Sequence, residues 1–309
     1  LIGGIDDPES YPIAKKRHTF EYLRTQAHLR TRTNTFGAVT RVRHTLANAI
    51  HDFFHSEDFY WVNTPIITAS DCEGAGELFR VSTLDLTNLP RDDKGQVDTS
   101  QDFFGSDAYL TVSGQLAVES YCLSMSKVYT FGPTFRAENS NTSRHLAEFW
   151  MVEPEMAFVE LEENMNWAEK LVVNIVNNVL ENCHNELIIL ERNVKKLEKV
   201  VPPFPRLTYK EAVRILNENG SSFEYGNDFG APDETLISKQ FEKPVIIHNW
   251  PADIKAFYMK RNEVESDIAL GMDIIAPEGF GEIVGGGQRE ENLEVLTDRI
   301  RNHDLPLEP

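Results

Sequence analysis

The chain has 309 residues, 41% of them apolar, and its 49 acidic against 30 basic side chains give a formal net charge of −19. This length and apolar content suffice for a large core in one or two domains. The negative charge argues against a nonspecific nucleic-acid binder, because neutralising phosphates requires a basic surface. No run of about 18 apolar residues predicts a membrane span and no secretory signal begins the chain, so we expect a cytoplasmic protein without a membrane partner.

Three cysteines, Cys72, Cys122 and Cys183, are widely spaced along the chain. They lack the paired spacing of a zinc site, and an odd number argues against a disulfide framework. We therefore expect reduced thiols.

Residues 1–35 contain two proline dipeptides, Asp7-Pro8 and Tyr11-Pro12, within a dense run of charge. This composition is typical of a linker. The first 43 residues are also basic, which could allow a polyanion to approach from this side, although a solvated linker explains the pattern better on composition alone.

A helical pattern follows the linker from Asn34 to about Ser56, with apolar residues at positions 36, 39, 42, 46, 50 and 53. One apolar face should pack on the core or on a partner. Residues 59–62 are β-prone and end at Thr64-Pro65, which favours a strand end or a sheet edge.

The rest of the chain alternates irregularly between expected strands and helices. We predict an irregular excursion at 84–108, strands at 109–112, 128–131, 134–138, 147–155, 245–248, 256–259, 269–275 and 282–284, a helix at 161–183, and a helix that starts at a capping box at Thr208 and ends at Gly220. Neither a P-loop nor a dinucleotide-binding fingerprint occurs. The pattern predicts an α+β fold with an antiparallel sheet flanked by helices.

Charged residues gather on the hairpin expected at 134–155. Arg136 and Glu138 should share one sheet face, and Arg144 and His145 lie across the turn. A guanidinium binds phosphate or carboxylate oxygens through two parallel hydrogen bonds, so the group suits a nucleotide triphosphate. A surface ion pair is the alternative for Arg136 and Glu138.

Two further pairs of acids could bind a ligand. Glu153 and Glu155 are two residues apart on an expected strand, so both should lie on the same face. Asp273 and Glu282 come before three consecutive glycines, 285–287, and Arg289 follows these glycines. Such carboxylates could bind an ammonium group, an amide or Mg²⁺, or they could be solvated turn residues. The glycines allow a ligand to approach the backbone closely.

Residues 135–138 with 144–145 resemble motif 2 of class II aminoacyl-tRNA synthetases, and the helix and strand ending at Pro65 resemble their motif 1. Together with residues 33–36, 70–77, 113–116 and 285–290, these motifs closely resemble asparaginyl-tRNA synthetases of the bacterial type. The similarity runs from about residue 11 to 300. The resemblance implies an enzyme that activates L-asparagine with ATP and transfers it to tRNA(Asn), with Mg²⁺ as cofactor and a homodimer as the assembly.

The resemblance also implies roles for individual residues. The catalytic Arg136 would contact the α-phosphate, Glu138 would read adenine, and Arg144 and His145 would hold the outer phosphates. Glu282, supported by Asp273, would bind magnesium, and this chain has Gly285 where relatives place a further serine ligand. The amino-acid site would comprise Glu77, Ser113, Gln115, Glu153 and Arg289.

Glu153 bears on the choice between asparagine and aspartate. Aspartate-specific relatives place an aspartate at this position and a lysine where this chain has Val118. A glutamate accepts from the asparagine amide but repels a carboxylate. We therefore expect asparagine as the substrate.

Two family parts do not occur in these 309 residues. We expect 1–32 to be the linker from an anticodon-binding domain, and 33–309 to be a catalytic domain that stops before motif 3. A polypeptide of only these residues should form adenylate poorly. Two alternatives remain open, a stand-alone paralogue that amidates aspartate and a non-catalytic module that dimerises or binds tRNA.

Overall fold

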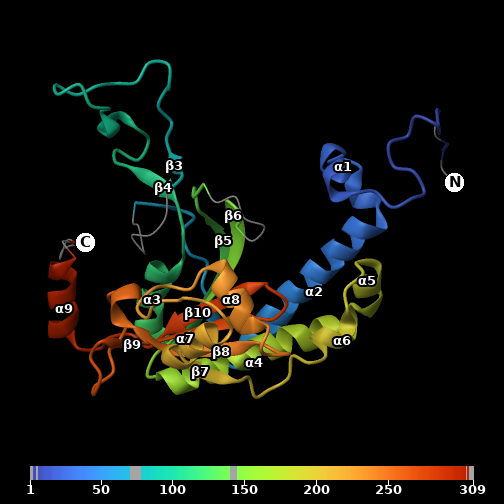
Figure 1. Ribbon diagram of the computed structural model, residues 1–309. Coiled ribbons are helices and arrows are strands. Elements are labelled where there is room, and N and C mark those ends of the chain that lie inside the picture. The colour runs from blue at the N-terminus through green and yellow to red at the C-terminus, as the bar shows by residue number, and fades with distance from the viewer. Residues whose placement is uncertain (1–2, 5, 70–77, 140–144, 304, 306–309) are drawn as a thin grey trace.

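The computed structural model describes residues 3–4, 6–69, 78–139, 145–303 and 305 (Figure 1). Its helices are α1 Phe20–Thr25, α2 Asn34–Ser56, α3 Gln115–Met125, α4 Leu161–Asn182, α5 His184–Ile189, α6 Val194–Leu197, α7 Tyr209–Glu218, α8 Ala231–Ser238 and α9 Leu293–Asn302. Its strands are β1 Tyr60–Trp61, β2 Ile67–Thr68, β3 Arg80–Val81, β4 Ala108–Leu110, β5 Lys127–Phe135, β6 Glu148–Met156, β7 Arg206–Thr208, β8 Val245–Pro251, β9 Ile268–Ala276 and β10 Gly281–Gly287.

Two sheets carry most of the chain. One has the order β10-β9-β8-β7 and the other the order β1-β5-β6. The long strand pairs β5/β6, β8/β9 and β9/β10 are antiparallel. Two short strands pair in parallel with a longer neighbour, β1 with β5 and β7 with β8. The predicted α+β fold with an antiparallel sheet is thereby confirmed.

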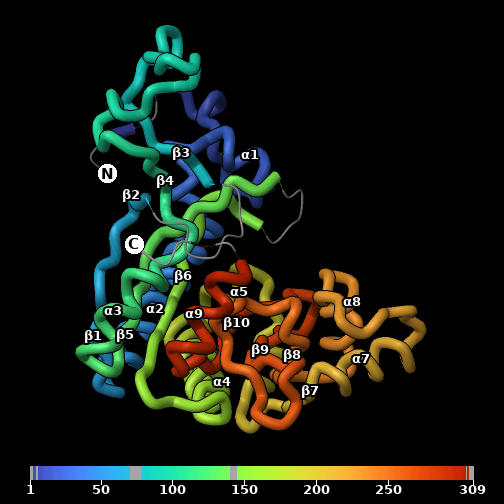
Figure 2. Tube along the Cα trace, turned by 90° about the vertical axis from the view of Figure 1, so that its left-hand side faces the viewer, coloured from blue at the N-terminus to red at the C-terminus, as the bar shows by residue number. Residues whose placement is uncertain are grey.

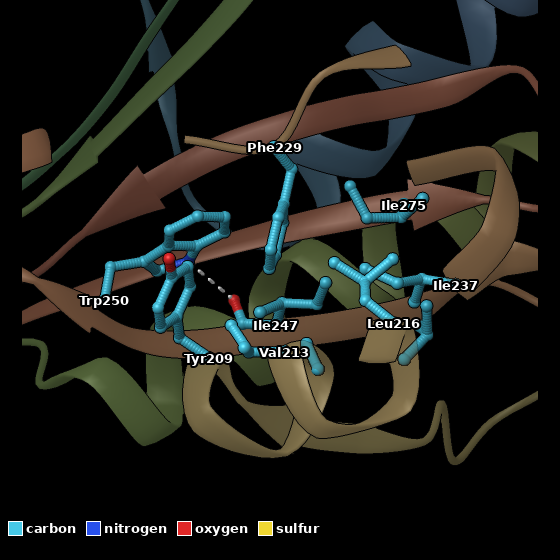
Figure 3. Close-up of a cluster of buried hydrophobic side chains, with 10 residues drawn as sticks. Tyr209, Val213, Leu216, Phe229, Ile237, Ile247, Trp250 and Ile275 are labelled. Carbon is cyan, nitrogen blue, oxygen red and sulfur yellow. Dashed lines mark hydrogen bonds between the residues drawn. The ribbon is translucent and has the colours of Figure 1, made fainter. Parts of the chain in front are cut away.

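The larger sheet is covered on one face by α7 and α8. Figure 3 shows the cluster between them, in which Tyr209, Leu216 and Ile237 pack on Ile247 and Trp250 of β8. The Trp250 indole Nε1 donates to the Ile247 carbonyl at 3.2 Å, so the polar atom of this buried ring is satisfied. This core packs α7 and α8 against β8 and, through Ile275, against β9.

Helices α2 and α4 pack against each other beside the smaller sheet. Contacts between aromatic rings join α2 to this sheet and to α4. Phe54 stacks on Tyr129 with ring centroids 4.4 Å apart, and the Tyr129 hydroxyl lies 2.7 Å from Nδ1 of His51. Phe53 of α2 meets Trp167 of α4 edge to face. Both helices cover their predicted ranges, because their apolar residues repeat at the helical period.

A segment between β3 and β4 projects from the body (Figures 1 and 2). It contains one short 3₁₀ helix, Thr99–Gln101, and is otherwise irregular, as predicted. Asp102 anchors its base by accepting from Ser82 Oγ at 2.7 Å, from Thr83 N at 2.9 Å and from Phe103 N at 2.7 Å. These donors, first the Ser82 hydroxyl, hold the pKa of Asp102 well below its ordinary value.

Two sequence predictions were wrong in detail. The strand predicted at 256–259 is a turn with one isolated bridge, Met259 to Arg289. The strands predicted at 128–131 and 134–138 form one strand, β5, which ends at Phe135. Pro133 does not interrupt it, because the proline nitrogen faces away from β6, on the side where β1 has already ended. Within residues 1–35, whose role as a linker stays a prediction, α1 is capped by the Thr19 side chain.

Candidate active site

The β5/β6 hairpin carries Arg136 at its open end. The Arg136 N–H donates to the Ala147 carbonyl at 3.1 Å, one step beyond the end of β5, and the guanidinium lies 5.7 Å from the centre of the Phe149 ring. Glu138 and His145 lie on exposed parts of the chain next to this end. Arg144 and Glu77, which the sequence also predicts as site residues, lie outside the described residues.

Glu153 occupies the middle of the same hairpin, opposite Thr130. Arg136 follows Thr130 by six residues on the partner strand, so about 20 Å of strand separates it from Glu153. The two predicted site residues therefore do not touch. Their spacing suits an elongated ligand, with one end at Glu153 and the other at the open end of the hairpin.

The carboxylate of Glu153 is held by the turn that precedes α3. It accepts hydrogen bonds from the Ser113 hydroxyl and, at 3.0 Å, from the Gly114 N–H. The Ser113 oxygen in turn accepts from the Gln115 N–H at 3.0 Å. Three predicted amino-acid-binding residues, Ser113, Gln115 and Glu153, are thus brought together, and Ser113 orients the carboxylate directly.

The space beside this turn is hollow. A pocket of about 200 Å³ is lined by Pro65, Thr68, Thr111, Ser113, Gly114, Leu116 and Ala117. A smaller cavity has Thr64, Thr130 and Glu153 in its wall. Gly114 lines both spaces.

Only glycine fits at position 114 in this arrangement. A Cβ there would lie 2.6 Å from Thr64 Oγ1, 2.8 Å from Thr130 Cγ2 and 3.3 Å from Glu153 Oε2. The first two distances are shorter than van der Waals contact. A side chain at this position would therefore push on the strand that carries Thr130 and displace the glutamate.

Arg289 reaches the hairpin from the segment after β10. Its Nη2 donates to Glu155 Oε1 at 2.9 Å and lies 3.5 Å from Glu119 Oε1, and the guanidinium lies 4.7 Å from the centre of the Tyr258 ring. Burial opposes its charge, but Glu155 and Glu119 outweigh burial and hold the pKa of Arg289 above its ordinary value. The Arg289 Nε is buried and has no hydrogen-bond partner among the described residues.

Glu155 lies two residues from Glu153 on β6, facing Arg289. Burial raises the pKa of Glu155 above its ordinary value, and the charges of Glu119 and Glu153 add to this, while Arg289 opposes it. One guanidinium and three carboxylates thus share one site.

A second acidic site lies on β9 and β10. Asp273 is buried and lies opposite Gly285 in the strand pairing. A β-bulge between Glu282 and Val284 puts Glu282 on the same sheet face, although Glu282 and Gly285 are an odd number of positions, three, apart. A Cβ on Gly285 would lie 2.8 Å from Glu282 Oε1 and 3.5 Å from Asp273 Oδ1. The two carboxylates therefore converge over this glycine.

These carboxylates share one lysine. Lys255 Nζ lies 2.7 Å from Asp273 Oδ2 and 4.0 Å from the centre of the Trp250 ring. Loss of hydration around the carboxylate, followed by the charge of Asp273, raises the pKa of Glu282 to about 8, although the residue as a whole is exposed. Burial also raises the pKa of Asp273 despite Lys255. The main-chain N–H of Glu282 also donates to Glu234 Oε2 at 3.4 Å.

The acidic site has the chemistry that Mg²⁺ requires, since magnesium prefers oxygen ligands and one or two carboxylates. Two converging carboxylates, of which Asp273 is buried and Glu282 exposed, would be stabilised by an added cation, because each disfavours the charge of the other. No group of three or more His, Cys, Asp or Glu arranged as metal ligands occurs within the described ranges. Asp273 and Glu282 are the two carboxylates that converge at this site.

A family model described as tRNA synthetases class II (D, K and N) matches residues 20–308. The chain belongs to this family. The asparagine–tRNA ligase of Hahella chejuensis (strain KCTC 2396) is 55% identical over 311 residues, which are 97% of this chain and 66% of that protein. The asparagine–tRNA ligase of Serratia proteamaculans (strain 568) is 55% identical over 319 residues, which are 100% of this chain and 68% of that protein.

Solved structures of class II synthetases have the same fold. The asparaginyl-tRNA synthetase of Pyrococcus horikoshii complexed with asparaginyl-adenylate matches with a TM-score of 0.82 and 34% identity, covering 94% of this chain and 62% of that one. The chain thus spans about two thirds of the length of the relatives that it matches. None of the helices in the described part is both long and apolar enough to cross a membrane.

Sequence reasoning missed Lys255 and Glu119, which the fold places in these sites of the class II synthetase. Lys255 lies beside the acids of β9 and β10. Glu119 lies beside Arg289, which is far from it in sequence. No local pattern marks either residue, and a lysine or glutamate in a polar stretch usually predicts a solvated surface.

Proposed function

We propose that the protein containing this chain is an asparagine–tRNA ligase, which activates L-asparagine with ATP and transfers it to tRNA(Asn). The observation that carries the proposal is the position of the Glu153 carboxylate. Hydrogen bonds from the Ser113 hydroxyl and the Gly114 N–H fix this carboxylate. Two residues along the same strand, Glu155 accepts a hydrogen bond from Arg289. The names of the relatives that the chain matches support the same activity.

The side chain of asparagine complements this pair of charges. Its amide NH₂ donates to a carboxylate such as Glu153, and its amide oxygen accepts from a guanidinium such as Arg289. An aspartate side chain has no donor for Glu153 at neutral pH and would be repelled by it. Because a site built for a donor rejects an analogue that lacks it, the pocket favours asparagine.

Glu77 and Gln115 remain our proposed contacts for the ammonium group of the substrate. The Gln115 backbone N–H already supports the Ser113 hydroxyl, and its side-chain amide donates to Glu119 at 3.0 Å. The carbonyl oxygen of this amide then points away from Glu119 and can accept from an ammonium group.

The nucleotide lies, in this proposal, toward the open end of the hairpin. Arg136 stabilises charge on the α-phosphate while the asparagine carboxylate attacks phosphorus in line, so that no protein base is needed. Glu138 contacts adenine, and Arg144 and His145 hold the outer phosphates. The bond from the α-phosphorus to the bridging oxygen breaks, and pyrophosphate leaves.

Asp273 and Glu282 would hold Mg²⁺, which, when bound, neutralises charge on the phosphates. The protein's own contribution is the bulge that brings Glu282 to Asp273, and Lys255, which limits the repulsion between them. A cytoplasmic location accompanies the proposed activity, since aminoacyl-tRNA is consumed by cytoplasmic ribosomes.

We also propose a homodimer through α2 and β1. Tyr60 and Trp61 are more than half exposed on β1, an edge strand of the smaller sheet. Exposed aromatic side chains next to an unpaired strand edge favour association. Domain boundaries at 1–32 and 33–309 remain a prediction.

ATP–pyrophosphate exchange on the full-length protein tests the activity. We expect exchange with asparagine and much weaker exchange with aspartate. Exchange with neither amino acid would contradict the proposal, and so would aspartate- and ammonia-dependent formation of free asparagine, which would indicate an amidating enzyme. The mass of the protein dimer in solution tests the assembly separately.

A further inference from the structure

Glu119 connects two side chains of the amino-acid site. Its Oε1 accepts from Gln115 Nε2 at 3.0 Å, and the same oxygen lies 3.5 Å from Nη2 of Arg289. That nitrogen also donates to Glu155 at 2.9 Å. One carboxylate oxygen of Glu119 thus contacts both Gln115 and Arg289.

The helix that carries Glu119 is firmly placed. Val118, its neighbour in α3, is fully buried and packs with Val62 and Val128, next to the start of β5. Gln115 lies one helical turn earlier, at the spacing that brings side chains into contact on one helix face. Glu119 therefore reaches Arg289 from a rigid element rather than from a loop.

The contact contributes little to folding. The side chains of Glu119 and Arg289 are 36% and 32% exposed, and ion pairs with this access to water stabilise proteins only weakly. Arg289 already has a closer carboxylate in Glu155. A second carboxylate next to the same guanidinium instead changes the charge that a ligand meets.

We propose that Glu119 is a positioning and specificity residue of the amino-acid site. It orients Gln115 and Arg289, and its negative charge weakens the attraction of Arg289 for a substrate with an acidic side chain. The inference rests on the proposed function. Glu119 and Glu155 lie beside the Arg289 guanidinium, and Glu153 is two residues from Glu155 on β6, so these four charges sum to a negative value. A neutral amide can still accept from Arg289, whereas a carboxylate is repelled by the surrounding acids.

The test measures kcat and KM for asparagine and for aspartate by ATP–pyrophosphate exchange, in the full-length wild-type protein and in Glu119→Gln. We expect the ratio of the two kcat/KM values to shift toward aspartate by about tenfold, because the variant removes one negative charge beside the guanidinium that would meet the substrate side chain. The change should be in KM, with kcat for asparagine changed by less than about twofold, because Glu119 does not touch the reacting atoms.

Two shorter variants separate charge from shape. Glu119→Asp keeps the carboxylate and should retain most of the wild-type ratio, whereas Glu119→Asn should resemble Glu119→Gln. If one variant fails to fold, judged by circular dichroism, the other pair still decides. Glu186→Gln is the matched control. Glu186 lies on α5, away from the amino-acid site, and its carboxylate pairs with Arg41 of α2 at 2.6 Å. Its replacement should leave the ratio of the two kcat/KM values unchanged.

If the wild-type protein activates asparagine and the ratio of the two kcat/KM values is unchanged in both Glu119→Gln and Glu119→Asn, this inference is overturned. The proposed function would then stand. An equal loss of kcat with both substrates would also overturn the inference, since that result indicates a general structural role. A wild-type protein that activates neither amino acid would overturn both.

Discussion

Lys255 and Asp273 form an ion pair of 2.7 Å in which the Asp273 side chain is 6% exposed and the Lys255 side chain 18% exposed. Glu282 lies against the same aspartate, and the charge of Lys255 acts on it as well. The lysine is therefore the charge that lets β9 and β10 carry two acids side by side. Its ammonium group also lies over the Trp250 ring, which links the acidic site to the core of the larger sheet.

Removing this lysine should destabilise the protein. We expect Lys255→Met to lower the free energy of unfolding by about 3 kcal/mol, because a buried carboxylate is left without its partner. Urea denaturation at pH 7 without Mg²⁺ measures the change. Adding Mg²⁺ should recover part of the loss, because the ion binds the folded state.

Lys199→Met is the matched control for that variant. Lys199 pairs with Glu242, whose side chain is 78% exposed, so its removal should cost less than about 1 kcal/mol. Equal losses in the two variants would contradict the special role of Lys255.

Gly114→Ala should impair asparagine activation. Its Cβ would clash with Thr64 and Thr130 and crowd Glu153, and we expect a loss of about 1 to 3 kcal/mol in stability from overpacking. Because the glutamate is displaced, KM for asparagine should rise at least about tenfold, which corresponds to about 1.4 kcal/mol. Exchange kinetics and thermal denaturation measure the two effects.

Gly132→Ala on β5 serves as the control for this prediction, since a Cβ there would meet no atom within 4 Å. Thr64→Ala added to Gly114→Ala should restore part of the stability by removing the closest atom. If the Gly114→Ala protein bound asparagine normally, the proposed part of Glu153 in specificity would be wrong.

Glu278 stabilises the turn between β9 and β10 through Arg192 and Lys196, with Lys196 Nζ at 2.8 Å. The hydrogen bond from Arg192 is the main cause that lowers the pKa of Glu278 from 4.5 to about 2. A lowered pKa stabilises the fold above the unfolded-state value near 4.5, and this contribution is lost as the pH falls toward 2.

Glu278→Gln should therefore lower the free energy of unfolding at pH 7. The shift corresponds to about 3 kcal/mol at most, and solvent screening of these partly exposed groups reduces this to about 1 to 2 kcal/mol. Urea denaturation at several pH values should show the gap between wild type and variant narrowing below about pH 4.5. A gap that stayed constant down to pH 3 would contradict this account.

Local patterns in the sequence predicted the elements whose own residues determine them. Thr208 caps helix α7, and both hydrogen bonds of the predicted capping box form there, because the signal is contained in four residues. Helix α3 was not predicted, since it starts at Gly114 without a side-chain cap and has no clear polar face. Tertiary contacts of Val118 determine that helix.

The candidate site was predictable only in part. Ser113 and Glu153 could be proposed from the family resemblance, and the structure brings them into direct contact. The parts that could not be predicted are long-range pairs. Lys255, which follows β8, meets Asp273 of β9, and Glu119 of α3 meets Arg289, which follows β10. Such contacts depend on how the sheets pack, which no periodicity in the sequence records.

The central claim is that Glu153 selects asparagine over aspartate. The most direct measurement is kcat/KM for the two amino acids in ATP–pyrophosphate exchange, for the full-length wild-type protein and Glu153→Gln. We predict that wild type prefers asparagine by at least about a hundredfold, in line with the loss of one charged hydrogen bond and added repulsion, and that the variant loses most of this preference. Equal use of both amino acids by wild type, or an unchanged preference in Glu153→Gln, would contradict the account.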